Sequence, residues 1–148
     1  KRLQRIVKNE NNVAYLDFAH APSKVEATTN AVKAQFENYE LVACFELHTF
    51  SSLNEEFLSQ YKNTMNAADK AYVYFSEHTL KMKRLPMLTK AQVAAAFNHP
   101  NMEVFTDSEL LQTELKNKNW ENKALLMMSS GNFHGLDVKA FCEKILFP

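Results

Sequence analysis

The chain has 148 residues, of which 46% are hydrophobic, and its 17 basic and 17 acidic residues give a formal net charge of zero. This length fits a single globular domain, and the balanced charge argues against a nucleic-acid or membrane surface as a partner. No apolar run approaches the roughly 20 residues that span a bilayer, and the polar start from Lys1 to Asn12 does not resemble a signal peptide. We therefore expect a cytoplasmic protein, with Cys44 and Cys142 as buried thiols rather than a disulfide.

The two ends of the sequence suggest that the chain is a segment of a longer protein. The chain begins at Lys1 without an initiating Met and closes on Phe147-Pro148 directly after an apolar run. We expect residues 1–148 to form one domain of a longer protein, although a processed or tagged chain would look the same.

The hydrophobic pattern predicts strands that alternate with helices. The first two runs, residues 3–7 and 13–18, flank a polar turn and predict an opening β-hairpin. A helix starts at Pro22-Ser23, and the continuous apolar run over 41–45 is typical of a strand buried on both faces. The later elements are a helix over 54–65, a strand over 71–75, a loop or insertion over 76–88, a helix over 89–98, a strand over 102–105, a helix over 107–116, a strand over 123–128 and a helix over 137–146.

This alternation indicates an α/β fold. We expect a Rossmann-like, mostly parallel sheet with helices on both faces, preceded by the antiparallel hairpin. Ligands of such sheets bind at the carboxyl ends of the strands. Three of the five histidines and both glycines fall in the loops that follow three of these strands, 17–22, 46–52 and 129–135.

Each of these residues also has a purely structural interpretation. Asp17, Ser51 and Ser52 are residue types that cap helices and turns, and the two glycines serve tight turns. His20, His48 and His134 lack the paired spacing of zinc ligands, so no metal site is predicted.

Two nucleotide motifs are missing from the sequence. It has neither a Gly-rich loop ending in Gly-Lys-Ser/Thr nor a Gly-x-Gly-x-x-Gly pattern. We therefore do not expect this domain to hold a nucleoside triphosphate alone.

The first loop carries a recognisable pattern. Arg2-Leu3, the hairpin and the string Asp17-Phe18-Ala19-His20-Ala21-Pro22 resemble the C-terminal domain of the Mur ligases, over nearly the whole chain. These are ATP-dependent, amide-bond-forming enzymes of peptidoglycan synthesis. The family's usual His-His-Pro is altered by Ala21, so any role of a second histidine is lost here.

The resemblance implies roles for single residues. Arg2 would approach the ATP phosphates as a catalytic group, and Asp17 would hold the nucleotide. A peptide pocket would be lined by His20, His48, Thr49, Ser51 and Ser52, with Asn132 and Phe133 as its far wall. The Mg²⁺ ligands, the phosphate loop and the UDP-N-acetylmuramate site would lie in upstream domains, so this domain alone is expected to be inactive.

The sequence of the second loop, residues 46–52, bears on which acceptor substrate is used. The L-alanine-adding ligase carries His-Arg-x-x-Arg there, whereas this chain reads His48-Thr49-Phe50-Ser51-Ser52. The loss of two long cations favours a wider pocket and the L-alanyl-γ-D-glutamyl-meso-diaminopimelate tripeptide as acceptor. The alternatives are the L-alanine-adding ligase, a folylpolyglutamate-type ligase and a non-catalytic flavodoxin-like binding module.

Overall fold

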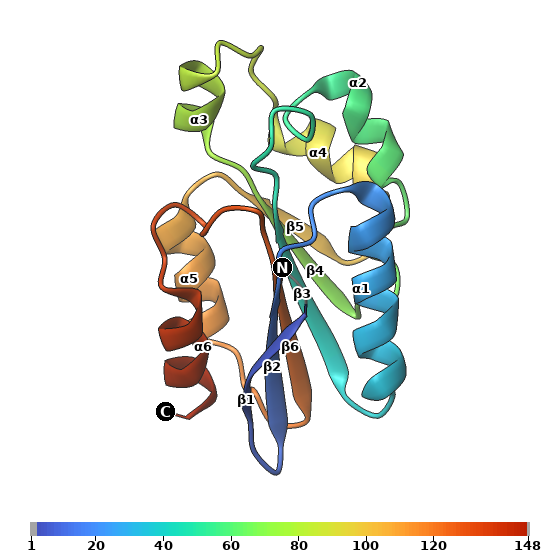
Figure 1. The fold of residues 1–148 in the computed structure, drawn as a ribbon, viewed down its shortest axis with the longest axis vertical. Coiled ribbons are helices and arrows are strands. Elements are labelled where there is room, and N and C mark those ends of the chain that lie inside the picture. The colour runs from blue at the N-terminus through green and yellow to red at the C-terminus, as the bar shows by residue number, and fades with distance from the viewer. Residues whose placement is uncertain (1–2, 148) are drawn as a thin grey trace.

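The computed structural model describes residues 3–147, and its centre is one six-stranded sheet (Figure 1). The strand order is β1-β2-β6-β3-β4-β5, and every neighbouring pair is parallel except β1 and β2. The predicted α/β class and the opening antiparallel hairpin are therefore confirmed. The strands are β1 (Gln4–Lys8), β2 (Asn12–Asp17), β3 (Glu40–Glu46), β4 (Lys70–Tyr74), β5 (Met102–Phe105) and β6 (Lys123–Met128).

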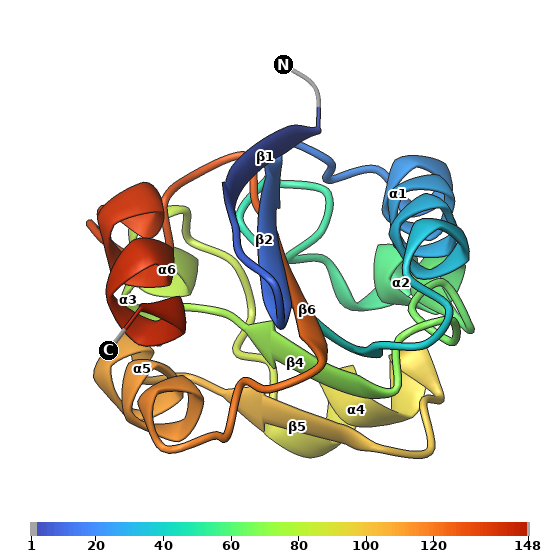
Figure 2. The ribbon, with the colours of Figure 1, turned by 90° about the horizontal axis from the view of Figure 1, so that it is seen from below.

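Helices cover both faces of this sheet. They are α1 (Pro22–Gln35), α2 (Glu55–Leu58), the 3₁₀ helix η1 (Ser59–Tyr61), α3 (Glu77–Met82), α4 (Lys90–Phe97), α5 (Ser108–Lys116) and α6 (Val138–Leu146). Figure 2 shows α5 and α6 on one face and α1 and α4 on the other. Because both faces are covered, the central strands β3 and β6 are almost wholly apolar, as expected for parallel strands.

Side chains alternate between two cores along each strand. On β6, Leu126 packs into the core under α1 and α4, and Leu125 packs into the core under α5 and α6; both are fully buried. The buried residues of α1 are Val25, Thr29 and Val32, which recur at the spacing of four and three residues expected for one side of a helix. The two cores therefore share one sheet as their common wall.

Polar side chains cap the N-termini of several helices. Thr89 and Gln92 form a reciprocal capping box at α4, and the side chains of Asn54, Asp107 and Asp137 cap α2, α5 and α6. The start of the helix predicted over 89–98 is thus confirmed.

Two predicted segments differ from the structure. The helix expected over 54–65 is only the single turn of α2, followed by η1 and by turns. Asn63, with φ of 66°, lies in the left-handed region, which ends any helix at this point. The segment over 76–88, expected as a loop or insertion, contains the short helix α3, which Ser76 caps.

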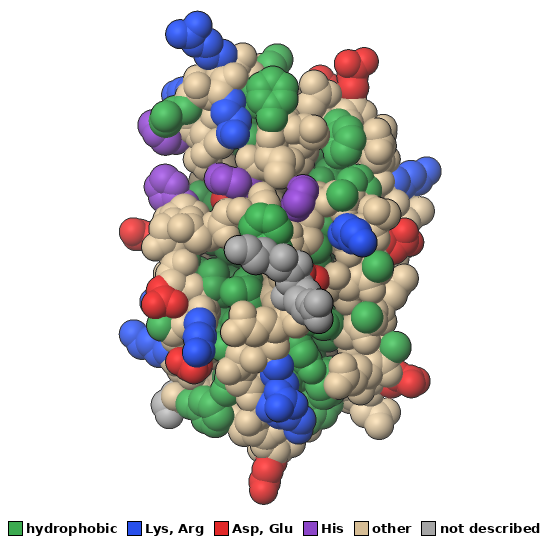
Figure 3. Space-filling view, viewed as in Figure 1, with side chains coloured by type: hydrophobic (Ala, Val, Ile, Leu, Met, Phe, Trp, Pro, Cys, Tyr) green, Lys and Arg blue, Asp and Glu red, His purple; other side chains and the backbone are tan. Residues whose placement is uncertain are grey.

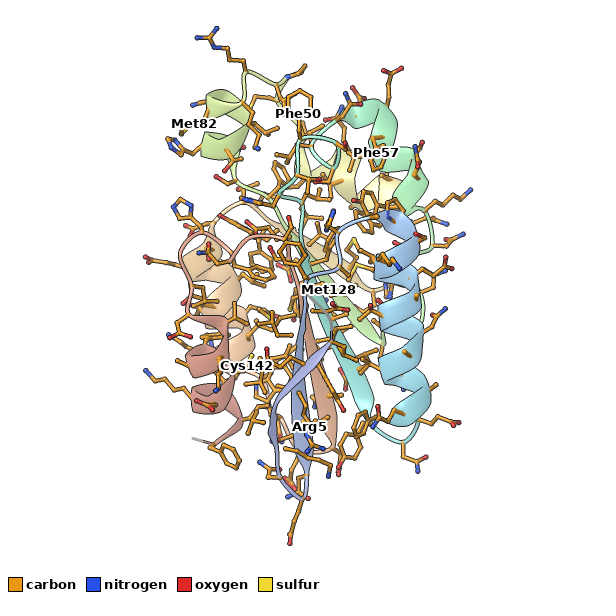
Figure 4. All side chains as sticks on the ribbon, viewed as in Figure 1. Arg5, Phe50, Phe57, Met82, Met128 and Cys142 are labelled. Atoms are coloured by element: carbon orange, nitrogen blue, oxygen red, sulfur yellow. The ribbon has the colours of Figure 1, made fainter. Side chains whose placement is uncertain are left out.

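Cys44 and Cys142 are both buried and free, as predicted. Burial raises the pKa of the Cys142 thiol to about 12 and that of Cys44 further. In Figure 4, Cys142 lies on α6. Neither thiol is a reactive nucleophile at neutral pH, because the thiolate is the reactive form.

Candidate functional site

The carboxyl ends of β2, β6 and β3 meet at one edge of the sheet. Asp17 on β2 and Phe45 on β3 are both in register with Met128 at the end of β6. The loop after β6 therefore lies between the loop after β2 and the loop after β3. Figure 3 shows histidine side chains gathered across this part of the molecule, and Figure 4 places Met128 at the centre of the edge, with Phe50, Phe57 and Met82 above it.

Asp17 lies under a cavity of about 490 Å³ beside the start of α1. Its side chain is only 7% exposed, and its Oδ2 accepts a hydrogen bond of 2.6 Å from the Thr28 hydroxyl. This hydrogen bond fixes the orientation of the carboxylate. The wall of the cavity is mainly apolar, and its polar groups include His20 and Lys24. Such a cavity, apolar with a few polar groups, is typical of small-molecule sites.

His20 closes one side of that cavity. Its ring contacts the Phe18 ring edge-on at 5.7 Å between centroids, and its Nδ1 lies 3.1 Å from the Phe18 carbonyl oxygen. Its own carbonyl accepts a 2.5 Å hydrogen bond from the Tyr61 hydroxyl. Burial raises the pKa of Tyr61, so the phenol stays protonated and keeps donating. The turn that carries His20 is thereby tied to η1.

Glu46 is a buried carboxylate at the end of β3, with 3% of its surface exposed. Its Oε1 accepts hydrogen bonds from the Ser129 hydroxyl at 2.5 Å and from the Phe133 backbone N–H at 2.9 Å. Its Oε2 lies 3.7 Å from Nδ1 of His48. Burial, followed by the negative charge of Glu46, raises the pKa of the neighbouring Tyr74 hydroxyl. The carboxylate thus joins the loop after β3 to the loop after β6.

The loop after β6 has an unusual backbone. Phe133 and His134 have φ of 55° and 65°, and Gly135 follows with φ of 81°. Left-handed backbone costs a residue other than glycine roughly 1–2 kcal/mol, so this loop is strained. Gly131 in the same loop lies flat against His48, because a Cβ at Gly131 would come within 2.9 Å of the imidazole ring.

The loop after β3 closes on itself. The Ser52 N–H donates to the Thr49 hydroxyl at 3.1 Å, and the Ser52 hydroxyl donates to the Thr49 carbonyl at 3.0 Å. Ser52 is only 1% exposed, so it shapes the turn rather than presenting its hydroxyl at the surface. Ser51 is exposed and lines a separate cavity of about 410 Å³ with Phe50 and Asn54.

The structure brings together some of the predicted site residues and separates others. Asp17 and His20 share one cavity, and His48 packs on the loop that carries Asn132. Asn132 is exposed, and its Oδ1 accepts a hydrogen bond from the Gly135 N–H at 2.8 Å. Phe133 is fully buried and stacks on Tyr74, so it anchors the loop instead of facing a ligand. Arg2 lies outside the described residues.

The sequence placed Glu46 and Ser129 in loops at this edge but gave no sign that they pair, and it gave no indication that Thr28 and Tyr61 belong to the edge. The signal for Glu46 was a charged residue directly after five apolar ones. Its partners lie 83 and 87 residues away, and no local pattern predicts such a pairing.

The described residues contain neither a metal-ligand cluster nor a membrane-spanning helix. Among residues 3–147, no group of three or more His, Cys, Asp and Glu side chains is placed to hold a metal ion. Within the same residues, the structure has no helix both long and apolar enough to cross a bilayer.

The fold and this edge define an α/β domain with a cavity of about 490 Å³ at the strand ends. Residues 1–131 match the family model described as Mur ligase, glutamate ligase domain, and the chain therefore belongs to this family. The matched range ends at Gly131, just before Asn132 and Phe133.

Named relatives agree with this family. The UDP-N-acetylmuramate–L-alanine ligase of Chlorobium phaeobacteroides is 31% identical over 94% of this chain and 31% of its own length. The chain thus spans about a third of that curated relative. Folylpolyglutamate synthases are also among the solved structures that share the fold.

Two crystal structures show the same fold at closer similarity. One is a murein peptide ligase of Psychrobacter arcticus, with a TM-score of 0.68 and 16% identity over 98% of this chain and 28% of that chain. The other is a single domain of a Haemophilus ducreyi protein described as a UDP-N-acetylmuramate:L-alanyl-γ-D-glutamyl-meso-diaminopimelate ligase. It has a TM-score of 0.64 and 23% identity over 98% of this chain and 97% of that chain.

Proposed function

We propose that residues 1–148 are the C-terminal domain of an ATP-dependent ligase that joins a murein peptide to UDP-N-acetylmuramate in peptidoglycan recycling, in the cytoplasm. The acceptor we favour is L-alanyl-γ-D-glutamyl-meso-diaminopimelate. Family membership supports the reaction class. The observation that carries the acceptor is the loop after β3, where Thr49 and Ser52 form a compact turn with no long cation.

In this proposal the nucleotide lies against the cavity at Asp17. An ATP-derived nucleotide fits a cavity of about 490 Å³ with a fixed carboxylate, an imidazole and an ammonium in its wall. Asp17 would bind the ribose side of the nucleotide, and Arg2 would approach the phosphates. The Mg²⁺ ligands and the phosphate loop would belong to other domains.

The acceptor peptide would lie along the edge between β3 and β6. His48, Thr49 and Asn132 present polar groups there. His20 would border the peptide from the cavity at Asp17, and Ser51 from the cavity that it lines with Phe50. The buried Ser52 and Phe133 would hold the two loops in shape. The γ-phosphoryl group of ATP would pass to the muramoyl carboxylate, which becomes an acyl phosphate, and ADP would leave. The acceptor amine would then attack the carbonyl carbon to form the amide bond, with release of inorganic phosphate and of the proton of the amine. Closure of the domains completes such a site, so the isolated chain would be inactive.

The first test is phosphate release from ATP by the complete ligase with UDP-N-acetylmuramate. We expect turnover that depends on the tripeptide and is far slower with L-alanine. Turnover with L-alanine alone would refute the acceptor and keep the reaction class. If neither acceptor supports turnover, the proposed reaction is refuted, and a folate ligase or a non-catalytic module takes its place.

The second candidate is an L-alanine-adding ligase. The 31% identity to the Chlorobium phaeobacteroides enzyme favours it. A single variant tests whether the loop after β3 borders the acceptor. Thr49→Arg restores one cation on a half-buried position. It removes the hydroxyl that accepts from the Ser52 N–H, but the backbone carbonyl that accepts from the Ser52 hydroxyl remains. We expect it to raise the KM for the tripeptide; an unchanged KM would show that this loop does not border the acceptor.

A further inference from the structure

Glu46 is a buried charge whose partners come from the far end of the chain. It follows five fully buried residues of β3, so its carboxylate is shielded from solvent and needs hydrogen-bond donors within the protein. It finds them in the Ser129 hydroxyl and the Phe133 N–H, both of which bind Oε1. Ser129 in turn accepts a hydrogen bond of 2.7 Å from the Gly131 N–H. One carboxylate oxygen thus organises the first five residues of the loop after β6.

The conformation that Glu46 holds is a strained one. Phe133 and His134 have left-handed backbones, which side chains other than glycine adopt rarely. Three further contacts hold the same segment: the Ser108 hydroxyl donates to the Phe133 carbonyl at 2.8 Å, Gly135 donates to Asn132 at 2.8 Å, and the Phe133 ring stacks on Tyr74. Strained backbone persists only where its surroundings fix it, and such strain concentrates at functional sites.

The second carboxylate oxygen connects this loop to the neighbouring one. Oε2 of Glu46 faces Nδ1 of His48 at 3.7 Å, and the ring of His48 lies against Gly131 with no room for a Cβ. The loops after β3 and β6 therefore form one unit around Glu46. Asn132 and His134 are exposed on this unit.

We propose that Glu46 is a positioning residue, whose buried carboxylate holds residues 129–135 in the strained conformation that presents Asn132 and His134 to the acceptor. This assignment rests on the proposed function for its acceptor, and on the hydrogen bonds and backbone angles for the clamp itself. The proposal places the nucleotide and the acceptor at two separate sites on one edge, because the cavity at Asp17 does not include Glu46, Asn132 or His134.

A merely structural role would give a different kinetic result. If Glu46 only stabilised the core, its replacement would lower the melting temperature and leave the KM values of the folded enzyme unchanged. A positioning role instead raises the KM for the acceptor and spares the KM for ATP.

The test compares Glu46→Ala and Glu46→Gln in the complete ligase. The alanine variant loses both hydrogen bonds to Oε1, and we expect the acceptor KM to rise about tenfold or more, with the ATP KM within about twofold of wild type. The glutamine variant keeps an acceptor oxygen and should recover most of the loss. Ser129→Ala removes one donor and gives an intermediate effect if Glu46→Ala does not fold.

Asp69→Asn is the matched control. Asp69 also accepts a backbone hydrogen bond, from the Leu41 N–H at 2.7 Å, and it forms an ion pair with Lys33. These contacts lie at the opposite edge of the sheet from Glu46. It should change stability and neither KM. Equal rises in both KM values of Glu46→Ala, or no rise in either, would overturn the positioning role.

Amide hydrogen exchange on the 148-residue chain tests the clamp independently of any reaction. We expect faster exchange at residues 129–135 in Glu46→Ala, with unchanged exchange in α5 and α6. If the wild-type ligase turns over no acceptor, the proposed function fails. The exchange experiment alone then decides whether Glu46 holds residues 129–135 in place. Unchanged exchange at these residues would refute it.

Discussion

Asp17 is the buried carboxylate in the cavity that we propose for the nucleotide. Asp17→Asn removes its charge but keeps an oxygen that accepts the hydrogen bond from Thr28, so the fold should persist. A hydrogen bond to a charged group contributes about 1.5–3 kcal/mol, so we expect the KM for ATP to rise roughly tenfold or more. Steady-state kinetics of the complete ligase measure this rise, with the acceptor KM as an internal reference.

The matched control for this variant is Asp107→Asn. Asp107 also follows a parallel strand, β5, but it is exposed, caps α5 and lies outside the cavity. It should leave the KM for ATP unchanged. Equal effects of the two variants would remove Asp17 from the nucleotide site.

Asp69 links stability to pH. Burial alone would raise its pKa, but the hydrogen bonds from the Leu41 N–H and Lys33, together with the positive charge of Lys33, hold that pKa below its ordinary value of 3.8. A carboxyl with a lowered pKa stabilises the fold fully above its unfolded pKa, and the stabilisation is lost as the pH falls through the folded pKa.

The free energy of unfolding of wild type should therefore exceed that of Asp69→Asn at neutral pH. The difference should shrink as the pH falls below about 4. Urea titrations at several pH values measure it, and a difference that stays constant down to pH 2 or so would contradict the assignment.

At the scale of single elements, helix starts are set by side-chain caps. At α4 the Thr89 hydroxyl accepts from the Gln92 N–H at 3.0 Å, and the Gln92 side chain accepts from the Thr89 N–H at 2.8 Å. Thr89→Ala should destabilise the protein by about 1 kcal/mol, because it leaves a helix N–H without its partner. Chemical denaturation measures the loss.

Thr113→Ala is the control for that cap. Thr113 is an exposed threonine within α5, and its hydroxyl only returns to the Glu109 carbonyl of the same helix. Alanine is the better helix former, so this variant should be neutral or slightly stabilising. A loss equal to that of Thr89→Ala would show that the cap contributes nothing.

Elements with a clear hydrophobic pattern were predictable from the sequence, and segments whose backbone depends on turns were not. The run over 41–45 predicted β3 because burial on both faces requires apolar residues throughout. Phe57, Leu58, Tyr61 and Met65 have helical spacing and three of them are buried, yet the segment turns at Asn63. There, packing against α4 fixes the side chains while the backbone departs from the helix.

The same distinction applies to the candidate site. Strand ends are readable in the sequence, so Asp17, His20 and His48 were placed at the correct edge. The hydrogen bonds of Glu46 depend on the strand order, which brings β6 beside β3, and on the strained turn after β6. Neither feature has a local signature, so this part of the site emerged only from the structure.

At the scale of the whole molecule, the sheet is the wall between two cores. Leu126 contributes to the core under α1 and α4, and Leu125 to the core under α5 and α6, from adjacent positions of one central strand. Trp120, the single tryptophan, packs in the core under α5 and α6. Tryptophan fluorescence therefore reports on one core, while far-UV circular dichroism reports on the helices of both faces.

This arrangement predicts one cooperative unfolding unit. Leu126→Ala leaves a cavity in the core opposite Trp120 and should cost about 2–5 kcal/mol. Because both cores share β6, the fluorescence and dichroism midpoints in urea should fall together, with an unchanged dependence on denaturant. Leu110→Ala, at an exposed leucine of α5, should move neither midpoint appreciably. If Leu126→Ala moved the dichroism midpoint alone, the two faces would unfold separately, and the edge that joins Asp17 to Glu46 would lack a rigid support.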